Sequence, residues 1–319
     1  MPATSPPTSL VTRRALAAFV LPIVFPVALL AACGEKVPEA AVDAPLAVVS
    51  TGLMTPESVL WDATRGVWYV TNINGSSLGK DDNGFIVRLG PDGAVMDTVP
   101  FINGADADIT LHAPKGMAIV GDTLYVADID AVRTFNLTTG TQLASIEMGA
   151  MGATFLNDVA AADNGVVYIT DSGMSFDPTG AILHPGKSRV FILVAGVATE
   201  AVLLPAESAV NGMAWDAARG AWLLVGFNSP NVFAWTPGAD SVEVLGTGPG
   251  GGDGIIVLAD GRALYSSWAD SSLTAFSNGT STTLRKGLPS PADLGYDAAR
   301  GIVAVPLFQN DRIEFWQVK

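Results

Sequence analysis

The sequence predicts an all-β fold, a six-bladed β-propeller of four-stranded blades, from three observations. A pattern of strand, turn and strand recurs six times from residue 57 onward, and each copy continues into a third apolar strand. The last copy ends without a fourth strand, whereas an additional β-rich segment, residues 46–50, precedes the first copy. We therefore expect a closed ring in which residues 46–50 form the fourth strand of the last blade. This pairing satisfies the backbone hydrogen-bonding groups of the last blade and of residues 46–50. A two-sheet sandwich, the alternative, explains neither the repetition nor the missing strand.

The six copies are alike in their first two strands, which are joined by Asp, Asn and Gly residues typical of tight hairpins. These paired strands are expected at residues 57–71, 115–127, 157–170, 211–224, 253–265 and 292–305. The third strands are expected at residues 85–89, 132–137, 190–194, 232–235, 273–276 and 313–316. A more polar fourth strand, such as residues 142–148, follows in the first five copies. Repetition of this kind is typical of propellers, in which each blade packs against its neighbours.

The composition excludes several classes of function. The chain has 319 residues and a formal net charge of −14, and an acidic surface repels nucleic acid. One cysteine and two histidines exclude a disulfide framework, a cysteine zinc cluster and a three-histidine metal site. No Gly-x-Ser-x-Gly sequence is present, so we expect no serine hydrolase of that type.

The first residues of the chain predict export and lipid attachment. Arg13 and Arg14 precede an uncharged apolar stretch, residues 15–32, as in a secretory signal. The sequence Leu30-Ala-Ala-Cys33 at its end resembles the bacterial lipobox, in which the cysteine is acylated and becomes the new N-terminus. An uncleaved membrane-spanning helix is the alternative, and the two prolines within the stretch disfavour it.

These features predict three segments. Residues 1–32 form a lipoprotein signal peptide, residues 33–45 a lipidated tether and residues 46–319 the propeller. We therefore expect the protein in the bacterial cell envelope, attached to a membrane through Cys33 and facing the periplasm. The sequence leaves the oligomeric state open.

The first residue of each copy is expected at one mouth of the central tunnel, because the innermost strands of a propeller line it. These positions hold Glu57, Lys115, Asn157, Asn211, Asp253 and Ala292. Four of them carry side-chain oxygens, which suit Ca²⁺. Four protein ligands leave coordination positions for water and substrate, and the absence of sulfur and imidazole disfavours zinc.

The same residue types also occur for purely structural reasons. Asn-Gly and Asp-Gly pairs are common in turns, but the four oxygen-bearing residues all fall at one phase of the repeat, which favours a shared site. The ammonium of Lys115 could pair with Glu57 and compete with a cation, or it could bind an anionic or carbonyl substrate. His112 and His184 lie in the long loops 102–114 and 171–188, where each could contact substrate, shuttle a proton or simply face solvent.

The opening residues also resemble those of the senescence marker protein, gluconolactonase and luciferin-regenerating-enzyme family. The resemblance spans residues 46–319 and is carried by Glu57 in Pro-Glu-Ser-Val-Leu-Trp-Asp, Asn157 in Leu-Asn-Asp-Val, Asn211 in Val-Asn-Gly-Met-Ala-Trp-Asp and Asp253 in Gly-Asp-Gly-Ile. The family fold is a six-bladed propeller, and diisopropylfluorophosphatase and paraoxonase are related. The chain departs from the family in Ser58-Val59, where Gly-Pro is frequent, and in Lys115.

The resemblance implies roles for these residues. Glu57, Asn211 and Asp253 would hold a divalent metal, Asn157 would contact metal or substrate, and Asp253 would be the catalytic base or nucleophile. With Lys115, His112 and His184 as further substrate contacts, this predicts a metal-dependent hydrolase of the lactonase or esterase type. We expect Ca²⁺ as cofactor and a small-molecule ester or lactone as substrate. A non-enzymatic binding propeller is the main alternative, and condensing chemistry like that of strictosidine synthase relatives is the third.

Overall fold

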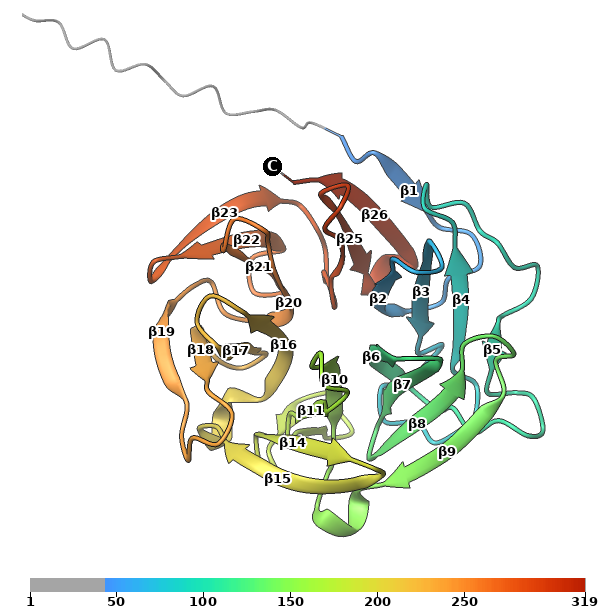
Figure 1. Cartoon of the computed structure of the whole chain (residues 1–319), viewed down its shortest axis with the longest axis horizontal. Coiled ribbons are helices and arrows are strands. Elements are labelled where there is room, and N and C mark those ends of the chain that lie inside the picture. Colours follow the sequence, from blue (N-terminus) through green and yellow to red (C-terminus); the bar gives the residue numbers. More distant parts are fainter. Residues whose placement is uncertain (1–43, 319) are drawn as a thin grey trace, which may run out of the picture. The chain divides into compact units, whose positions relative to one another are not determined.

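The computed structural model describes residues 44–318, and strands dominate it (Figure 1). The predicted all-β class is confirmed: the only helices among residues 44–318 are three 3₁₀ turns, η1 (Gly149–Met151), η2 (Ala206–Ser208) and η3 (Phe308–Asn310). No helix of this part of the chain has the length and apolar character needed to cross a membrane. The predicted signal peptide, Cys33 and the tether up to residue 43 lie outside the described residues.

The strands form antiparallel meanders arranged around a common axis (Figure 1). The first sheet contains β2 (Pro56–Asp62), β3 (Val67–Asn72), β4 (Phe85–Leu89) and β5 (Ile102–Asn103). The second contains β6 (Pro114–Val120), β7 (Thr123–Asp128), β8 (Ala131–Asn136) and β9 (Gln142–Glu147). The third contains β10 (Leu156–Ala161), β11 (Val167–Asp171), β14 (Arg189–Val194) and β15 (Val197–Leu203). A separate hairpin, β12 (Ser175–Phe176) and β13 (Ile182–Leu183), lies between β11 and β14 in the chain.

The fourth sheet has eight strands. One half contains β16 (Val210–Asp216), β17 (Ala221–Gly226), β18 (Asn231–Trp235) and β19 (Glu243–Thr247). The other half contains β20 (Gly252–Val257), β21 (Ala263–Ser267), β22 (Ser272–Ser277) and β23 (Thr280–Lys286). The two halves are joined by a single parallel pair, Thr247 with Thr280.

The last sheet joins the two ends of the described chain. It contains β24 (Gly295–Asp297), β25 (Ile302–Leu307), β26 (Arg312–Gln317) and β1 (Ala47–Val49), and β1 pairs antiparallel with β26. The backbone N–H of Leu46 also donates to the carbonyl of Phe315 at 2.7 Å. The predicted pairing of residues 46–50 with the last sheet is therefore observed, and it covers the edge that β26 would otherwise expose.

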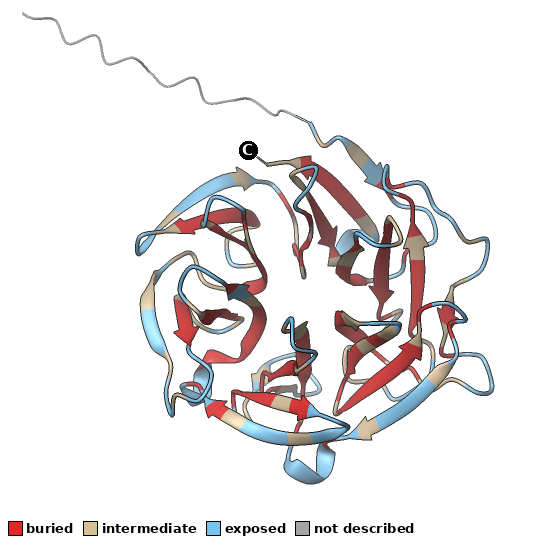
Figure 2. Cartoon of the chain, viewed as in Figure 1, coloured by how far each residue is buried: buried red, intermediate tan, exposed pale blue. Residues whose placement is uncertain are grey.

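Hydrophobic side chains hold neighbouring sheets together. Trp68 and Val70 of the first sheet pack with Ile313 and Phe315 of the last, and similar buried clusters lie between the other consecutive meanders. Figure 2 shows the consequence: the inner strands are buried, whereas outer strands such as β9, β15 and β23 are exposed along much of their length. Sheet-on-sheet packing of this kind fixes the inner strands around the axis.

Five inner strands break register at the residues that the sequence singles out. Each of these strands has one shift in its pairing with the second strand of the sheet. The shift lies between Pro56 and Val59 in β2, between Pro114 and Met117 in β6, between Leu156 and Val159 in β10, between Val210 and Met213 in β16, and between Gly252 and Ile255 in β20. Each shift is a β-bulge, which re-aims side chains at that point. The Asn211-Gly212 and Asp253-Gly254 pairs therefore lie in strand bulges rather than in turns.

Glycine at the second bulge position allows close contact between inner strands. A Cβ on Gly212 would lie 2.2 Å from the carbonyl oxygen of Asp253, and one on Gly254 would lie 2.3 Å from the backbone nitrogen of Leu294. Backbone atoms cannot move aside without displacing the neighbouring strand. These glycines therefore set the spacing of the inner ring.

We expect Gly212→Ala to destabilise the protein by about 2 kcal/mol or more, because the added methyl group meets backbone in a close-packed interior. Urea unfolding followed by circular dichroism measures the change. Gly149→Ala is a matched control, since its Cβ would meet only the flexible end of Asp130 at 3.0 Å. Equal stability of the two variants would contradict this account of the inner ring.

Candidate functional site

Five of the six predicted mouth residues line one cavity of about 210 Å³. They are Glu57, Lys115, Asn157, Asn211 and Asp253, each from the bulge of a different inner strand. The sixth, Ala292, is fully buried and does not line the cavity. The ring thus brings together side chains that are far apart in sequence, and the predicted convergence is observed.

Loops that connect second and third strands complete the cavity wall. Ile73 and Ser77 come from the loop after β3, Met174 and Phe176 from the segment after β11, and Trp268 from the loop after β21. Loops far apart in the sequence therefore meet around this cavity. The loop 102–114 contributes no lining residue and instead contacts the first loop, where the N–H of Gly84 donates to the carbonyl of Leu111.

Two carboxylates in the cavity each have one oxygen without a hydrogen-bond partner. Glu57 and Asp253 are each 4% exposed, and Oε2 of Glu57 and Oδ1 of Asp253 are buried without a partner. An unpaired buried carboxylate oxygen is costly in a folded protein. These orphaned oxygens are the arrangement expected of ligands for a cation.

The pKa values of these groups reflect the same crowding. Burial first, and then the carboxylates of Asp253 and Asp293, raise the pKa of Glu57 well above its usual range. Burial and the nearby Asp293 likewise raise the pKa of Asp253. Lys115 acts in the opposite direction on Glu57 without reversing the shift. Protonation of both groups is therefore easier than for an exposed carboxyl, and a bound cation would act against that shift.

Hydrogen bonding fixes the amide of Asn157. Ser172 donates its hydroxyl proton to the carbonyl of Val210 at 2.6 Å, so its oxygen is free to accept. Nδ2 of Asn157 donates to that oxygen at 3.3 Å. The amide carbonyl Oδ1 of Asn157 is then the atom left available as a ligand. Asn211, 3% exposed, adds a second amide to the same cavity.

Lys115 is held away from Glu57. Its Nζ donates to the carbonyls of Ala113 at 3.0 Å and Ser77 at 3.3 Å, and it lies 4.5 Å from the ring centre of Phe155. Among the described residues, no ion pair joins Lys115 to Glu57 or to another carboxylate. Burial lowers the pKa of Lys115, and Glu57 and Asp128 oppose that shift. The lysine therefore leaves the oxygens of Glu57 accessible.

Two buried ion pairs support this part of the cavity. Asp128 accepts from the backbone N–H of Ala113 at 2.7 Å and pairs with Arg133 at 2.9 Å. In the next sheet, Asp171 accepts from the N–H of Phe155 and pairs with Arg189, each at 3.1 Å. Sequence reasoning missed both pairs, although an Asp that ends the second strand and an Arg in the third recur in these two copies.

The structure places both histidines outside the cavity lining. Nδ1 of His112 lies 3.0 Å from the carboxylate of Asp82, and the N–H of Asp82 donates to the same atom at 3.1 Å. Nδ1 of His184 is buried without a hydrogen-bond partner in the segment after β13. Neither placement supports the predicted contact with substrate.

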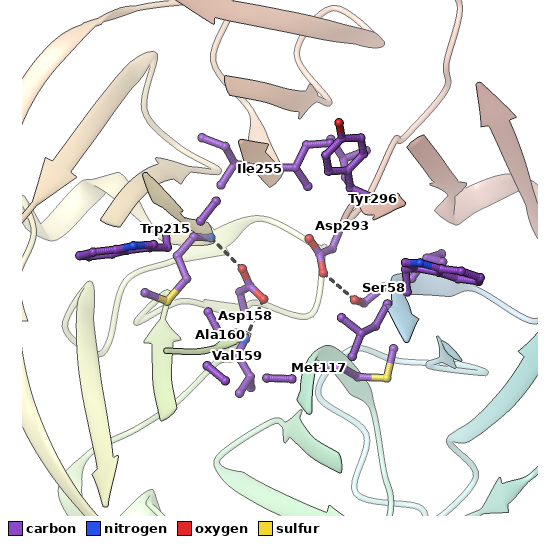
Figure 3. A pocket seen from close by; sticks show the side chains of 18 of the residues that line it. Ser58, Met117, Asp158, Val159, Ala160, Trp215, Ile255, Asp293 and Tyr296 are labelled. Atoms are coloured by element: carbon purple, nitrogen blue, oxygen red, sulfur yellow. Dashed lines mark hydrogen bonds between the residues drawn. The ribbon is translucent and has the colours of Figure 1, made fainter. Parts of the chain in front are cut away.

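A second hollow of about 450 Å³ lies at the other end of the inner strands (Figure 3). Asp158 and Asp293 project into it, and both follow a mouth position directly in the sequence. Ser58 donates to Asp293 at 2.5 Å, and the N–H of Met213 donates to Asp158 at 2.7 Å. Sequence reasoning missed these carboxylates, although both occupy the second position of a copy.

The cavity side chains fit a hard divalent cation. Two carboxylates and two amides offer oxygen donors, which suit Ca²⁺ or Mg²⁺ better than Zn²⁺. Within residues 44–318, no three His, Cys, Asp or Glu side chains gather in metal-binding geometry, so any site here depends on the amides of Asn157 and Asn211.

Solved structures with the same fold include gluconolactonases and a regucalcin. A gluconolactonase from Xanthomonas campestris is 16% identical, with a TM-score of 0.61 over 86% of this chain and 92% of that chain. A putative gluconolactonase is 17% identical, with a TM-score of 0.62 over 85% and 91%. Regucalcin from Agrobacterium tumefaciens, a calcium-binding protein, is 15% identical, with a TM-score of 0.60 over 82% and 84%.

These neighbours match the family that the sequence resembles. At identities of 15–17% the likeness shows the fold alone. No protein-family model matches the sequence, and no curated protein matches it.

We expect the stability of the metal-free protein to depend on the charge of Asp293. Burial raises the pKa of Asp293 from 3.8 to about 6, so the folded state keeps a proton that the unfolded state releases. This contribution to stability is complete below about pH 4 and is lost as the pH rises through about 6. As the pH rises from about 4 to above 6, the stability of Asp293→Asn relative to wild type should therefore grow by up to about 3 kcal/mol.

Denaturant unfolding in EDTA at a series of pH values measures this difference. Asp163→Asn, which removes one carboxyl from an exposed turn, is the control for the loss of a negative charge. If the difference in unfolding free energy between Asp293→Asn and wild type stays constant from pH 4 to pH 7, Asp293 does not titrate in this range.

Proposed function

We propose that this chain is a divalent-metal-dependent hydrolase of the lactonase or esterase type. One observation carries the proposal: the unpartnered oxygens of Glu57 and Asp253 and the amides of Asn157 and Asn211 line the same cavity. Uncompensated carboxylates with neutral oxygen donors favour a bound cation over an empty site. The calcium binding of the regucalcin neighbour and the activity named for the gluconolactonases support this proposal.

The four side chains have distinct proposed roles. Glu57, Asn157 and Asn211 hold the cation, and Asp253 holds it while also reaching the substrate. A bound Ca²⁺ supplies Lewis-acid polarisation of the substrate carbonyl oxygen. Asp253 removes a proton from the attacking water, acting as the general base.

Lys115 has a positioning role in this proposal. Its Nζ is fixed by two backbone carbonyls at the edge of the cavity, so its charge has one location. From there it attracts the carbonyl oxygen or an anionic group of the substrate. Because no ion pair joins it to Glu57, it does not block the cation ligands.

Two further proposals concern the chain as a whole. We propose that the ring has six blades, counting each half of the eight-stranded sheet as one, and the single bridge between Thr247 and Thr280 supports this count.

We also propose that the chain is exported and lipid-anchored at Cys33, facing the periplasm. The basic residues, the apolar stretch and the Leu-Ala-Ala-Cys sequence support that proposal.

Hydrolysis of small lactones and esters should require both a divalent cation and Asp253. EDTA should abolish hydrolysis and Ca²⁺ should restore it, because the carbonyl is then polarised again. Asp253→Asn should lower kcat/KM by about 100- to 10,000-fold, the usual range for loss of a general base. Calorimetric titration with Ca²⁺ should show weaker binding in Asp253→Asn and in Glu57→Gln.

Asp163→Asn, on an exposed turn, is the matched control and should behave as wild type in both measurements. Full activity in excess EDTA, or an unchanged rate in Asp253→Asn, would overturn the proposed mechanism. Absence of Ca²⁺ binding at millimolar concentration would favour the non-enzymatic binding propeller.

The lipid anchor has an independent test. In a bacterial host given labelled palmitate, the wild-type chain should incorporate label and remain with the membranes. Cys33→Ser removes the acylated thiol, so the label should be lost. Labelling of Cys33→Ser equal to wild type would contradict attachment at this residue.

A further inference from the structure

The walls of the cavity differ in chemistry from its floor. The floor consists of the five polar residues from the inner strands, whereas the walls come mainly from loops. The apolar wall residues are Ile73, Phe155, Met174, Phe176, Phe227, Trp268 and Phe308, and the polar ones are Ser77 and Gln309. A ligand seated on the floor is therefore surrounded by hydrocarbon on most sides.

The aromatic wall residues contact one another in two groups. The ring centres of Phe227 and Trp268 are 5.3 Å apart, and those of Trp268 and Phe308 are 5.4 Å apart. Phe155 and Phe176 form the other group, with centres 6.0 Å apart and rings nearly perpendicular. Edge-to-face contacts of this kind hold the rings in place.

The wall offers few partners for hydroxyl groups. Apart from Ser77 and Gln309, its hydrogen-bonding group is the indole N–H of Trp268, which lies close enough to Asp253 to lower the pKa of that carboxyl. The ammonium of Lys115 already donates to two carbonyls, which leaves one proton for a ligand. A sugar lactone carries a hydroxyl on almost every ring carbon, and each one buried without a partner is costly.

The volume suits a small ring system. An apolar cavity of about 150 Å³ is sufficient for benzene, and this cavity is somewhat larger at about 210 Å³. A lactone ring fused to an aromatic ring, or one with a short alkyl chain, has the size to fill it. Volume alone does not exclude a sugar lactone, so the preference between sugar lactones and apolar lactones depends on the chemistry of the walls.

We propose that the cavity selects lactones and esters with an aromatic or alkyl substituent over polyhydroxylated sugar lactones, and that Phe176 determines this specificity. The inference rests on the proposed hydrolase function and names its substrate class. It also separates this chain from the gluconolactonases that share its fold.

The hairpin of β12 and β13 places Phe176 at the mouth. Its turn is closed by Asp177, which accepts from the N–H groups of Thr179 at 2.8 Å and Ala181 at 2.9 Å. Phe176 lines the cavity yet remains 39% exposed, so its ring can cover a ligand without being needed for the core. Leu183, on the other strand of the hairpin, is 48% exposed and does not line the cavity.

Three probes of graded polarity test the proposal: dihydrocoumarin, glucono-1,5-lactone and the unsubstituted δ-valerolactone. The Ca²⁺-loaded wild-type chain should show a kcat/KM for dihydrocoumarin about 100-fold above that for glucono-1,5-lactone. Phe176→Ala should lower the dihydrocoumarin value about 10-fold and change the δ-valerolactone value less than about twofold. Phe176→Leu should recover most of the loss, and Leu183→Ala should match wild type.

Binding of chroman, which has the fused rings without the carbonyl, gives a readout that is independent of hydrolysis. Calorimetry should detect chroman binding to wild type and about 10-fold weaker binding to Phe176→Ala. Chroman binding without hydrolysis of any lactone would support the apolar cavity and overturn the proposed hydrolase. A preference for glucono-1,5-lactone, or equal values for wild type and Phe176→Ala with every probe, would overturn the specificity proposal.

Discussion

The β-bulge at the start of five inner strands is the constraint on which the candidate site depends. In a regular strand, consecutive side chains point to opposite faces of the sheet. The bulge adds a residue, so that two consecutive side chains can both reach the tunnel. Glu57 faces the smaller cavity while Ser58 faces the larger hollow, and Asn157 and Asp158 divide in the same way. Where the second position would meet a neighbouring strand, as at Gly212, only glycine fits. One backbone irregularity, repeated around the axis, therefore creates both chambers.

The bulges also gather negative charge where water is scarce. Burial is the largest cause of the raised pKa of four carboxyl groups, Glu57, Asp158, Asp253 and Asp293, and the charge of Asp293 adds to the shift in the other three. A single ammonium, that of Lys115, is too little to balance them, and its protons are directed at carbonyls. Such a cluster must either keep protons or acquire a cation. In the larger hollow, hydrogen bonds from Ser58 and from the backbone N–H of Met213 satisfy the carboxylates of Asp293 and Asp158. In the smaller cavity, two oxygens have no such partners, and this difference points to the smaller cavity as the place for a cation.

Sequence reasoning located strands well and misjudged some side chains, for physical reasons. The third strand 85–89 agrees with β4, because apolar runs bounded by turn residues leave little freedom. The fourth strand of the first sheet, by contrast, is only Ile102–Asn103, within a segment expected to be a loop. Repeat phase identified the mouth residues. It could not reveal Asp293, because strict alternation would turn the residue after a mouth position away from the tunnel. His112 was assigned to the site from its side-chain chemistry and its place in a long loop. Its pairing with Asp82 was not predicted, because that pairing depends on two loops that meet in space.

The floor and the walls of the cavity are held in place by different interactions. The residues proposed for catalysis and the residues proposed to select the substrate can therefore change independently. Hydrogen bonds from the second strand of one sheet to the first residues of the next copy fix the floor: Thr170 of β11 donates to the carbonyl of Asn211 at 2.6 Å, and Ser266 of β21 donates to that of Ala292 at 2.8 Å. Moving a floor residue would therefore disturb the adjoining sheet. The walls are loops joined mainly by ring contacts, such as that of Phe155 with Phe176. Loops tolerate substitution better than the strands they connect. The same ring of oxygens can thus serve different substrates as the wall side chains change, and a shared fold leaves the substrate undetermined.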